Sequence, residues 1–216
     1  MTDAHCHVSA SDPTVKELLV GRDFFGLHPW ETLEKDAGEI RRSLEELKGE
    51  WARNPSCGVG EIGLDRLKVR EIPPVMRETY AEQLAFALAS DRPIVLHGAK
   101  CWGETLKAFP ASASLAHVLF HGFSRSGGLI PEIAARGGFI SVGPAILNDH
   151  AVNYRALVKT IPRANLLLET DRTESSEEVR LEDVLLKTAE LLGISPETLE
   201  RETDENARRF CPKILV

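Results

Sequence analysis

The chain has 216 residues and a formal net charge of −7, and 43% of its residues are hydrophobic. This composition is typical of a globular protein with enough apolar material for one core, so we expect a single domain over residues 1–216. The acidic balance argues against binding through a broad basic surface, although a local site could still meet phosphate through metal ions.

The four cysteines are scattered and form no C-x-x-C motif, which excludes a zinc ribbon and a thioredoxin-like pair. The sequence shows neither a basic stretch followed by an apolar run near its start nor any run of 18 apolar residues. We therefore expect reduced thiols, no membrane segment and a cytoplasmic location. No feature of the sequence indicates an obligate protein partner.

Short apolar segments alternate with helical patterns along the chain. We expect strands over residues 2–8, 22–28, 56–62, 92–98, 116–122, 137–143 and 164–170. We expect helices over residues 31–52, 73–91 and 196–210, and Ser195 and Pro196 form a typical start for the last one. Several strands are nearly continuous apolar runs, as in parallel sheets that are buried on both faces.

This alternation predicts an α/β fold, a TIM-like (β/α) barrel. A complete barrel has eight strands and about 250 residues. With about seven parallel strands expected, the barrel should be distorted or incomplete and short by one strand–helix unit. The shortage falls between His7 and the strand at residues 22–28, where only residues 12–20 show the pattern of a short helix.

Metal-binding residue types stand at the ends of several predicted strands. His5 and His7 are two residues apart, so on a strand both side chains point to one face. A single histidine at a strand end is more often a structural residue, but a group of six is hard to explain without metal. The six residues are His5, His7, Glu61, His97, His121 and Asp171.

The charge of this group indicates how many metal ions it would hold. Four neutral imidazoles and two carboxylates carry −2, so two divalent cations would leave a positive centre that suits an anionic substrate. Mixed nitrogen and oxygen ligands fit zinc, manganese or iron, and magnesium fits a carboxylate-rich position. We therefore expect one or two divalent metal ions, with Zn, Mn and Mg all open.

The motifs "DAHCH", "GLHPW", "GEIGLD", "RPIVLHG", "HGFS", "ETD" and "NARRF" together resemble the TatD-type metal-dependent deoxyribonucleases, a branch of the metallo-hydrolase barrels. The resemblance implies a distorted barrel that hydrolyses phosphodiester bonds and removes nucleotides from DNA ends. It also implies that His5, His7 and Asp171 hold one metal, that His97 and His121 hold a second, and that Glu61 bridges them. Glu61 and Asp171 would be the catalytic carboxylates, with Asp171 as the general base.

The segments that would face the substrate depart from the family pattern. The stretch before "GLHP" is short, Gly98, Ala99 and Lys100 follow the fourth-strand histidine where an arginine is common, and no proline closely follows "ETD". These departures motivate two alternatives to a deoxyribonuclease that acts on DNA ends or short oligonucleotides. One is a barrel hydrolase of a C–N or ester bond, and the other is a catalytically silent metal-binding protein.

Further residues near the strand ends are candidates for supporting roles. We expect His28, Lys100 and Arg125 to contact substrate phosphate, although His28 could instead fix the turn at Pro29. Asp65 could hydrogen-bond a metal ligand or brace its own loop, and Glu169 could hydrogen-bond a ligand histidine.

Overall fold

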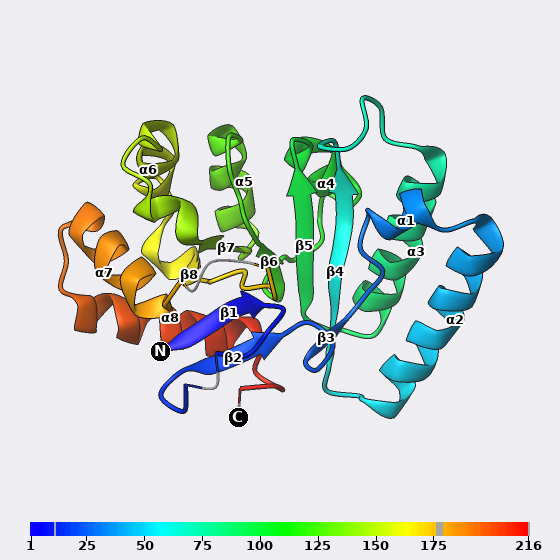
Figure 1. Ribbon diagram of the computed structural model, residues 1–216, viewed down its shortest axis with the longest axis horizontal. Coiled ribbons are helices and arrows are strands. Elements are labelled where there is room, and N and C mark those ends of the chain that lie inside the picture. Colours follow the sequence, from blue (N-terminus) through cyan, green and yellow to red (C-terminus); the bar gives the residue numbers. More distant parts are fainter. Residues whose placement is uncertain (11, 176–178, 216) are drawn as a thin grey trace.

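The computed structural model describes residues 1–10, 12–175 and 179–215, and these contain eight β-strands (Figure 1). Two parallel sheets are formed, one with the order β1-β2 and one with the order β3-β4-β5-β6-β7-β8. The strands are β1 (Thr2–Cys6), β2 (Lys16–Leu19), β3 (Phe24–Phe25), β4 (Gly58–Asp65), β5 (Ile94–Ala99), β6 (Val118–Phe120), β7 (Phe139–Val142) and β8 (Leu166–Leu168).

The strand that the sequence did not predict is β2. Residues 12–20 were expected to form a short helix, and this expectation is wrong, because Lys16–Leu19 pairs in parallel with β1 through Thr2↔Lys16 and Cys6↔Leu19. Lys, Glu and Leu favour helices, but this weak preference is overridden by pairing with β1 and by burial of Leu18 in the core. The shortened stretch therefore keeps its strand, and none of the described residues between β1 and β3 is helical.

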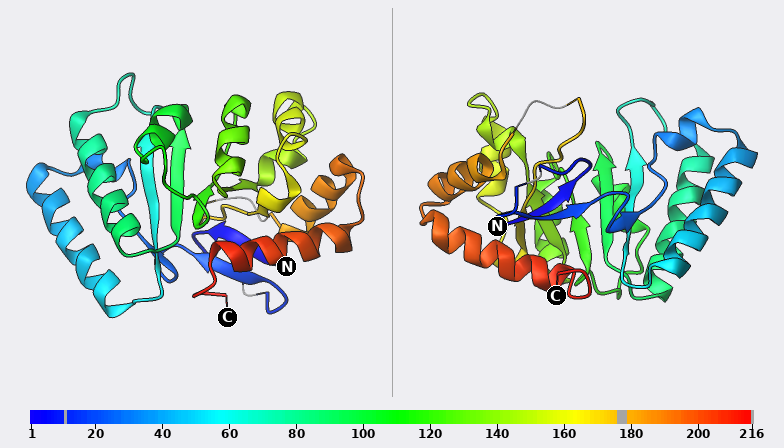
Figure 2. Two further views of the ribbon diagram at one scale, coloured as in Figure 1. Left: turned by 180° about the vertical axis from the view of Figure 1, so that it is seen from behind. Right: turned by 60° about the horizontal axis from the view of Figure 1, so that its bottom comes forward.

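The two sheets are joined at both edges into a distorted barrel, which confirms the predicted fold class. On one side an isolated parallel bridge links Val20 to Phe24. On the other side, just beyond β8, the Asp171 N–H donates to the His5 carbonyl over 3.0 Å, and the His7 N–H donates to the Arg172 carbonyl over 2.8 Å. The views in Figure 2 show the β1–β2 pair beside the larger sheet.

Helices cover the outer faces of the larger sheet. They are α1 (Glu31–Glu34), α2 (Ala37–Arg53), α3 (Pro74–Ala89), α4 (Trp102–Lys107), α5 (Ile130–Ala135), α6 (Val152–Val158), α7 (Leu181–Leu192) and α8 (Pro196–Phe210). The single helix expected over residues 31–52 is divided, because the Asp36 side chain accepts from the Glu39 N–H in a capping box that starts α2. The helices expected near residues 73–91 and 196–210 are present as α3 and α8, and Ser195 caps α8 by accepting from the Thr198 N–H.

Apolar side chains fill the barrel beneath the strand ends. Val95, Leu119 and Leu167 are fully buried, and each lies two residues before a polar residue that the sequence placed in the site. Residues two apart on a strand share a face, so the polar layer lies directly above this apolar one. Phe210 of α8 closes the layer from below and stacks on Phe24, with ring centroids 5.9 Å apart. Among the described helices, none is long and apolar enough to cross a membrane.

Candidate metal centre

The structure brings the six predicted ligands together at the carboxyl ends of the strands. His5 lies in β1 and His7 just after it, Glu61 lies in β4, and His97 lies in β5. His121 directly follows β6, and Asp171 is the third residue after the end of β8. All except His7, His97 and Asp171 are buried. The strand ends therefore act as the scaffold that the barrel topology predicts for a site.

The Glu61 carboxylate lies at the middle of the centre and divides its two oxygens between two groups of histidines. Its Oε2 lies 3.6 Å from His5 Nε2 and 3.4 Å from His7 Nε2. Its Oε1 lies 2.9 Å from His97 Nδ1 and also contacts His121 Nε2. Glu61 therefore offers one oxygen to each group of histidines.

The first group is completed by Asp171. Its Oδ1 lies 3.6 Å from His5 Nε2 and 3.5 Å from His7 Nε2. The residue has a φ of 48°, in the left-handed region, and its N–H is held by the His5 carbonyl. Nearly half of its side chain is exposed (45%), so this carboxylate faces both the histidines and solvent.

The donor atoms fit divalent metal ions. In the described part of the chain, both ring nitrogens of His5 are buried and lack a hydrogen-bond partner, which is costly for imidazole unless something else binds it. Three sets of donor atoms lie close enough to share an ion: His5, His121 and Asp171; His5, His7 and Glu61; and His28, Glu61 and His97. Imidazole nitrogens with carboxylate oxygens suit zinc and manganese.

Two further carboxylates contact the ligand histidines from outside, as the sequence suggested for Asp65 and Glu169. Asp65 Oδ2 lies 2.7 Å from His97 Nε2, and its Oδ1 accepts from the Leu67 N–H, so both contacts considered for this residue are present. Glu169 Oε1 accepts from the Gly122 N–H over 2.8 Å, while its Oε2 lies 3.8 Å from His121 Nδ1. Such carboxylates orient the imidazoles toward the centre.

The two central strands approach each other closely, which explains a glycine in the "GEIGLD" motif. Gly63 has a φ of 148°, and a Cβ at this position would lie only 1.9 Å from the His97 carbonyl oxygen. Only glycine therefore allows β4 and β5 to bring Glu61 and His97 within contact.

The charges of the group stabilise one another. Burial alone would raise the pKa of Glu61, but the surrounding histidines, His121 foremost, hold it well below its usual value. Hydrogen bonds to Asp171 and Glu61 raise the pKa of His7 to about 9. Burial opposes the charged form of His97, but its contacts with Asp65 and Glu61 outweigh this effect and raise its pKa. The carboxylates are thus ionised, and metal binding would release the protons that these histidines hold, because a ligand imidazole must be neutral.

His28 follows β3 and lies beside the second group. Its Nε2 lies 3.9 Å from Glu61 Oε1, and its ring centroid lies 4.6 Å from that of His97. Its Nδ1 accepts from the backbone N–H of Trp30 over 3.2 Å. This is the contact that was expected if His28 fixes the turn at Pro29. Burial lowers the pKa of His28 to about 4, so the ring is neutral.

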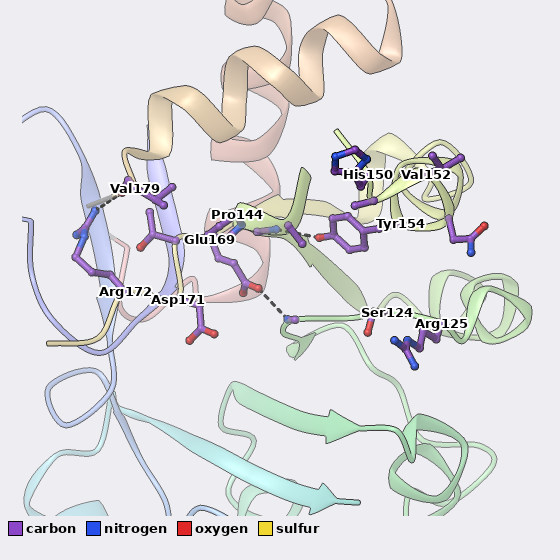
Figure 3. Close-up of a pocket in the computed structure, with 16 residues that line it drawn as sticks. Ser124, Arg125, Pro144, His150, Val152, Tyr154, Glu169, Asp171, Arg172 and Val179 are labelled. Carbon is purple, nitrogen blue, oxygen red and sulfur yellow. Dashed lines mark hydrogen bonds between the residues drawn. The ribbon is translucent and has the colours of Figure 1, made fainter. Parts of the chain in front are cut away.

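A cavity of about 1040 Å³ opens beside the centre on the side of β6, β7 and β8 (Figure 3). Glu169 and Asp171 line its inner end, and Arg125 lies at the opposite wall. Lys100, in contrast, is exposed after β5 and does not line this cavity. Among the lining residues that were not candidates from the sequence are His150 and Tyr154, whose signal was their place in the loop and helix after a predicted strand.

The chain is similar to known proteins over most of its length. The family model described as "TatD related DNase" matches residues 19–212. The "uncharacterized metal-dependent hydrolase YabD" of Bacillus subtilis is 24% identical over 208 residues, which cover 90% of this chain and 80% of that protein. The "3'-5' ssDNA/RNA exonuclease TatD" of Pectobacterium atrosepticum is 26% identical over 201 residues, with 85% and 75% covered.

Solved structures share the fold. The crystal structure of YjjV, a TatD homologue from Escherichia coli K12, superposes with a TM-score of 0.69 at 21% identity and covers 94% of this chain and 78% of that one. A TatD family hydrolase from Entamoeba histolytica gives a TM-score of 0.70 at 18% identity, with 91% and 75% covered. Both comparisons place the described strands in the same distorted barrel architecture.

Proposed function

The chain belongs to the family of TatD-related DNases, a family of metal-dependent hydrolases, and from this premise we propose that it hydrolyses phosphodiester bonds at DNA ends or in short oligonucleotides. The observation that carries the proposal is the division of the Glu61 oxygens between two groups of histidines, as two ions about one carboxylate would need. The name of the Pectobacterium relative, an exonuclease of single-stranded DNA and RNA, supports a nucleic-acid substrate.

In this proposal His5, His7 and Asp171 would hold one ion, His97 and His121 would hold the other, and Glu61 would offer an oxygen to each. Divalent ions at these positions would lower the pKa of water toward neutrality and stabilise the charge on attacking and leaving oxygens. The candidate ions are Zn, Mn and Mg, and we propose that one or two of them bind.

The residues of the chain supply the remaining chemistry. Asp171 is ionised and partly exposed toward the cavity, so its carboxylate is placed to accept the proton of the attacking water. Arg125, at the cavity wall, would bind a phosphate oxygen of the bound strand. Lys100 would contact the strand outside the cavity, because it lies in the exposed loop after β5.

The test is metal-dependent release of nucleotides from a labelled single-stranded oligonucleotide. We expect activity when metal-free protein is reloaded with Zn²⁺, Mn²⁺ or Mg²⁺, and a loss of at least 100-fold in the His97→Ala and Asp171→Asn variants. Asp183→Asn on the exposed face of α7 is the matched control and should keep full activity. A protein that is shown to contain metal but releases no nucleotide would contradict the proposal, and hydrolysis of an ester or amide panel instead would favour the C–N or ester hydrolase.

A further inference from the structure

Hydrogen bonds hold the backbone on both sides of His28. The Leu27 N–H donates to Gln83 Oε1 over 2.7 Å, and the Leu27 carbonyl accepts from Gln83 Nε2 over 3.2 Å. Gln83 is itself buried in α3. On the other side, the His28 carbonyl accepts from the Glu31 N–H over 3.0 Å. The imidazole is therefore presented to the centre from a fixed turn.

The hydrogen bond from Trp30 decides which nitrogen of His28 carries the proton. Nδ1 accepts a hydrogen bond from the backbone N–H of Trp30, so this nitrogen has no hydrogen of its own. A neutral imidazole has one protonated nitrogen, which must then be Nε2. Nε2 is the atom that faces the centre, 3.9 Å from Glu61 Oε1.

This tautomer excludes two of the roles that a histidine could play here. A metal ligand needs an unshared electron pair on the nitrogen that faces the ion, and so does a general base. The only such pair on the neutral ring is on Nδ1, where it is taken by Trp30. His28 lies close enough to Glu61 and His97 to share a metal ion with them. Because of this tautomer, we assign it another role.

We propose that His28 is a fixed N–H donor that binds an oxygen of the phosphodiester at the Glu61–His97 side of the centre, and that it is neither a metal ligand nor a proton-transfer group. The assignment rests on the proposed phosphodiesterase function. The proton stays on Nε2 throughout, and the interaction strengthens as negative charge develops on the phosphate oxygens. The Trp30 N–H acts as the positioning group that keeps Nε2 protonated.

Three substitutions separate these roles. His28→Gln keeps an N–H donor near the Nε2 position, His28→Asn places its amide near the Nδ1 position, and His28→Ala removes both. We measure Mn²⁺ or Zn²⁺ binding to the metal-free proteins, and kcat and KM for bis(4-nitrophenyl) phosphate at saturating metal. His117→Gln, at the opposite end of β6 where its Nδ1 lies 3.0 Å from the Phe210 carbonyl, is the matched control.

We expect all variants to bind metal with unchanged stoichiometry and within about twofold of the wild-type affinity. The kcat should fall about 100-fold in His28→Ala and His28→Asn, with little change in KM. His28→Gln should have most of the wild-type kcat, and both limbs of its pH–rate profile should remain. A tenfold loss of metal affinity would show that His28 is a metal ligand. Loss of one limb of the pH–rate profile would show that it transfers a proton, and a wild-type kcat in His28→Ala would show that it has no role in the reaction. Each of these results would overturn the proposal.

A measurement on the wild-type protein needs no substitution and no activity. Long-range ¹H–¹⁵N spectra of the metal-free and Zn²⁺-loaded protein report which nitrogen of His28 is protonated, and we expect Nε2–H in both. A ring with Nδ1–H would overturn the inference even if the enzyme is active. Wild-type protein that carries metal but fails to cleave any phosphodiester would instead contradict the proposed function.

Discussion

Each imidazole of the second group has one nitrogen toward Glu61 and the other toward a carboxylate outside the centre. For His97 that partner is Asp65, which is 1% exposed and 2.7 Å away. For His121 it is Glu169, which is further away at 3.8 Å. The contact to Asp65 should therefore contribute more to metal binding than the contact to Glu169.

Asp65→Asn tests this contribution while it preserves the size of the side chain. Loss of the charge weakens the hold on His97 and lowers the basicity of its Nδ1, so we expect metal affinity to fall about 10- to 100-fold. A competition titration against a chromophoric chelator measures it, and Asp183→Asn is the control. Unchanged affinity in Asp65→Asn would show that Asp65 only braces the Leu67 loop.

The candidate ligand residues could be named from the sequence, because strand-end position and residue type are both readable from it. It could not show the tautomer of His28, because the deciding N–H comes from the backbone of Trp30. Tyr154 was missed for a similar reason. Its hydroxyl accepts from the Gly143 N–H over 3.1 Å, and only this packing of α6 brings its side chain to the cavity.

At the scale of elements, the join between β1 and the end of β8 carries two of the candidate ligands, His5 and Asp171. Asp3 of β1 is buried and accepts from the Thr170 N–H over 3.0 Å and from the Thr170 hydroxyl over 2.6 Å. Thr170 is next to Asp171, whose N–H is held by His5. These contacts fix the first group of ligands at the point where the barrel closes.

Asp3 makes this join sensitive to pH. Burial raises the pKa of Asp3 from 3.8 to about 7, so the folded state prefers the protonated acid. The stability that protonation contributes is fully present below pH 3.8 and is lost as the pH rises through 7. Asp3→Asn has no such charge and can still hydrogen-bond Thr170.

We expect the metal-free Asp3→Asn protein to gain free energy of unfolding relative to the wild type by about 2 to 3 kcal/mol between pH 5 and pH 8. Urea unfolding in EDTA at both pH values measures the difference, with Asp183→Asn as the control. A constant difference between variant and wild type across this range would show that Asp3 is ionised in the folded protein.

The largest difference between the expected and the observed elements lies at β2. Residues 12–20 have helix-forming side chains, and only Leu18 of β2 is buried, so the local pattern carries little strand signal. Pairing with β1 is a long-range effect that local preference does not contain. The buried strands β4 to β8 were predicted because their apolar runs record burial on both faces.

Across the whole molecule, a net charge of −7 surrounds a site that would bind an anion. Many lysine and arginine side chains on the described surface form ion pairs with carboxylates. Among the described residues, Lys100 and Arg125 form none. A single-stranded substrate should therefore be held by few phosphate contacts, and binding should depend only weakly on salt.

For a substrate of about ten nucleotides, we expect a plot of log(kcat/KM) against log[salt] to be shallow. Each of Lys100→Gln and Arg125→Gln should reduce its slope by about 0.7, the contribution of one phosphate contact on a single strand. Lys107→Gln, exposed on α4, is the control and should leave the slope unchanged. Unaltered slopes in both site variants would show that neither residue contacts phosphate.

The parallel barrel class, the six candidate ligands and the family resemblance can all be read from the amino-acid sequence. These depend on residue type, alternation along a strand and the rule that parallel strands end at one edge. The tertiary structure alone decided that residues 16–19 form a strand, that Glu61 divides its oxygens between two histidine groups, and that His28 presents an N–H. Those features depend on contacts between segments far apart in the chain, or on backbone hydrogen bonds, which side-chain patterns do not record.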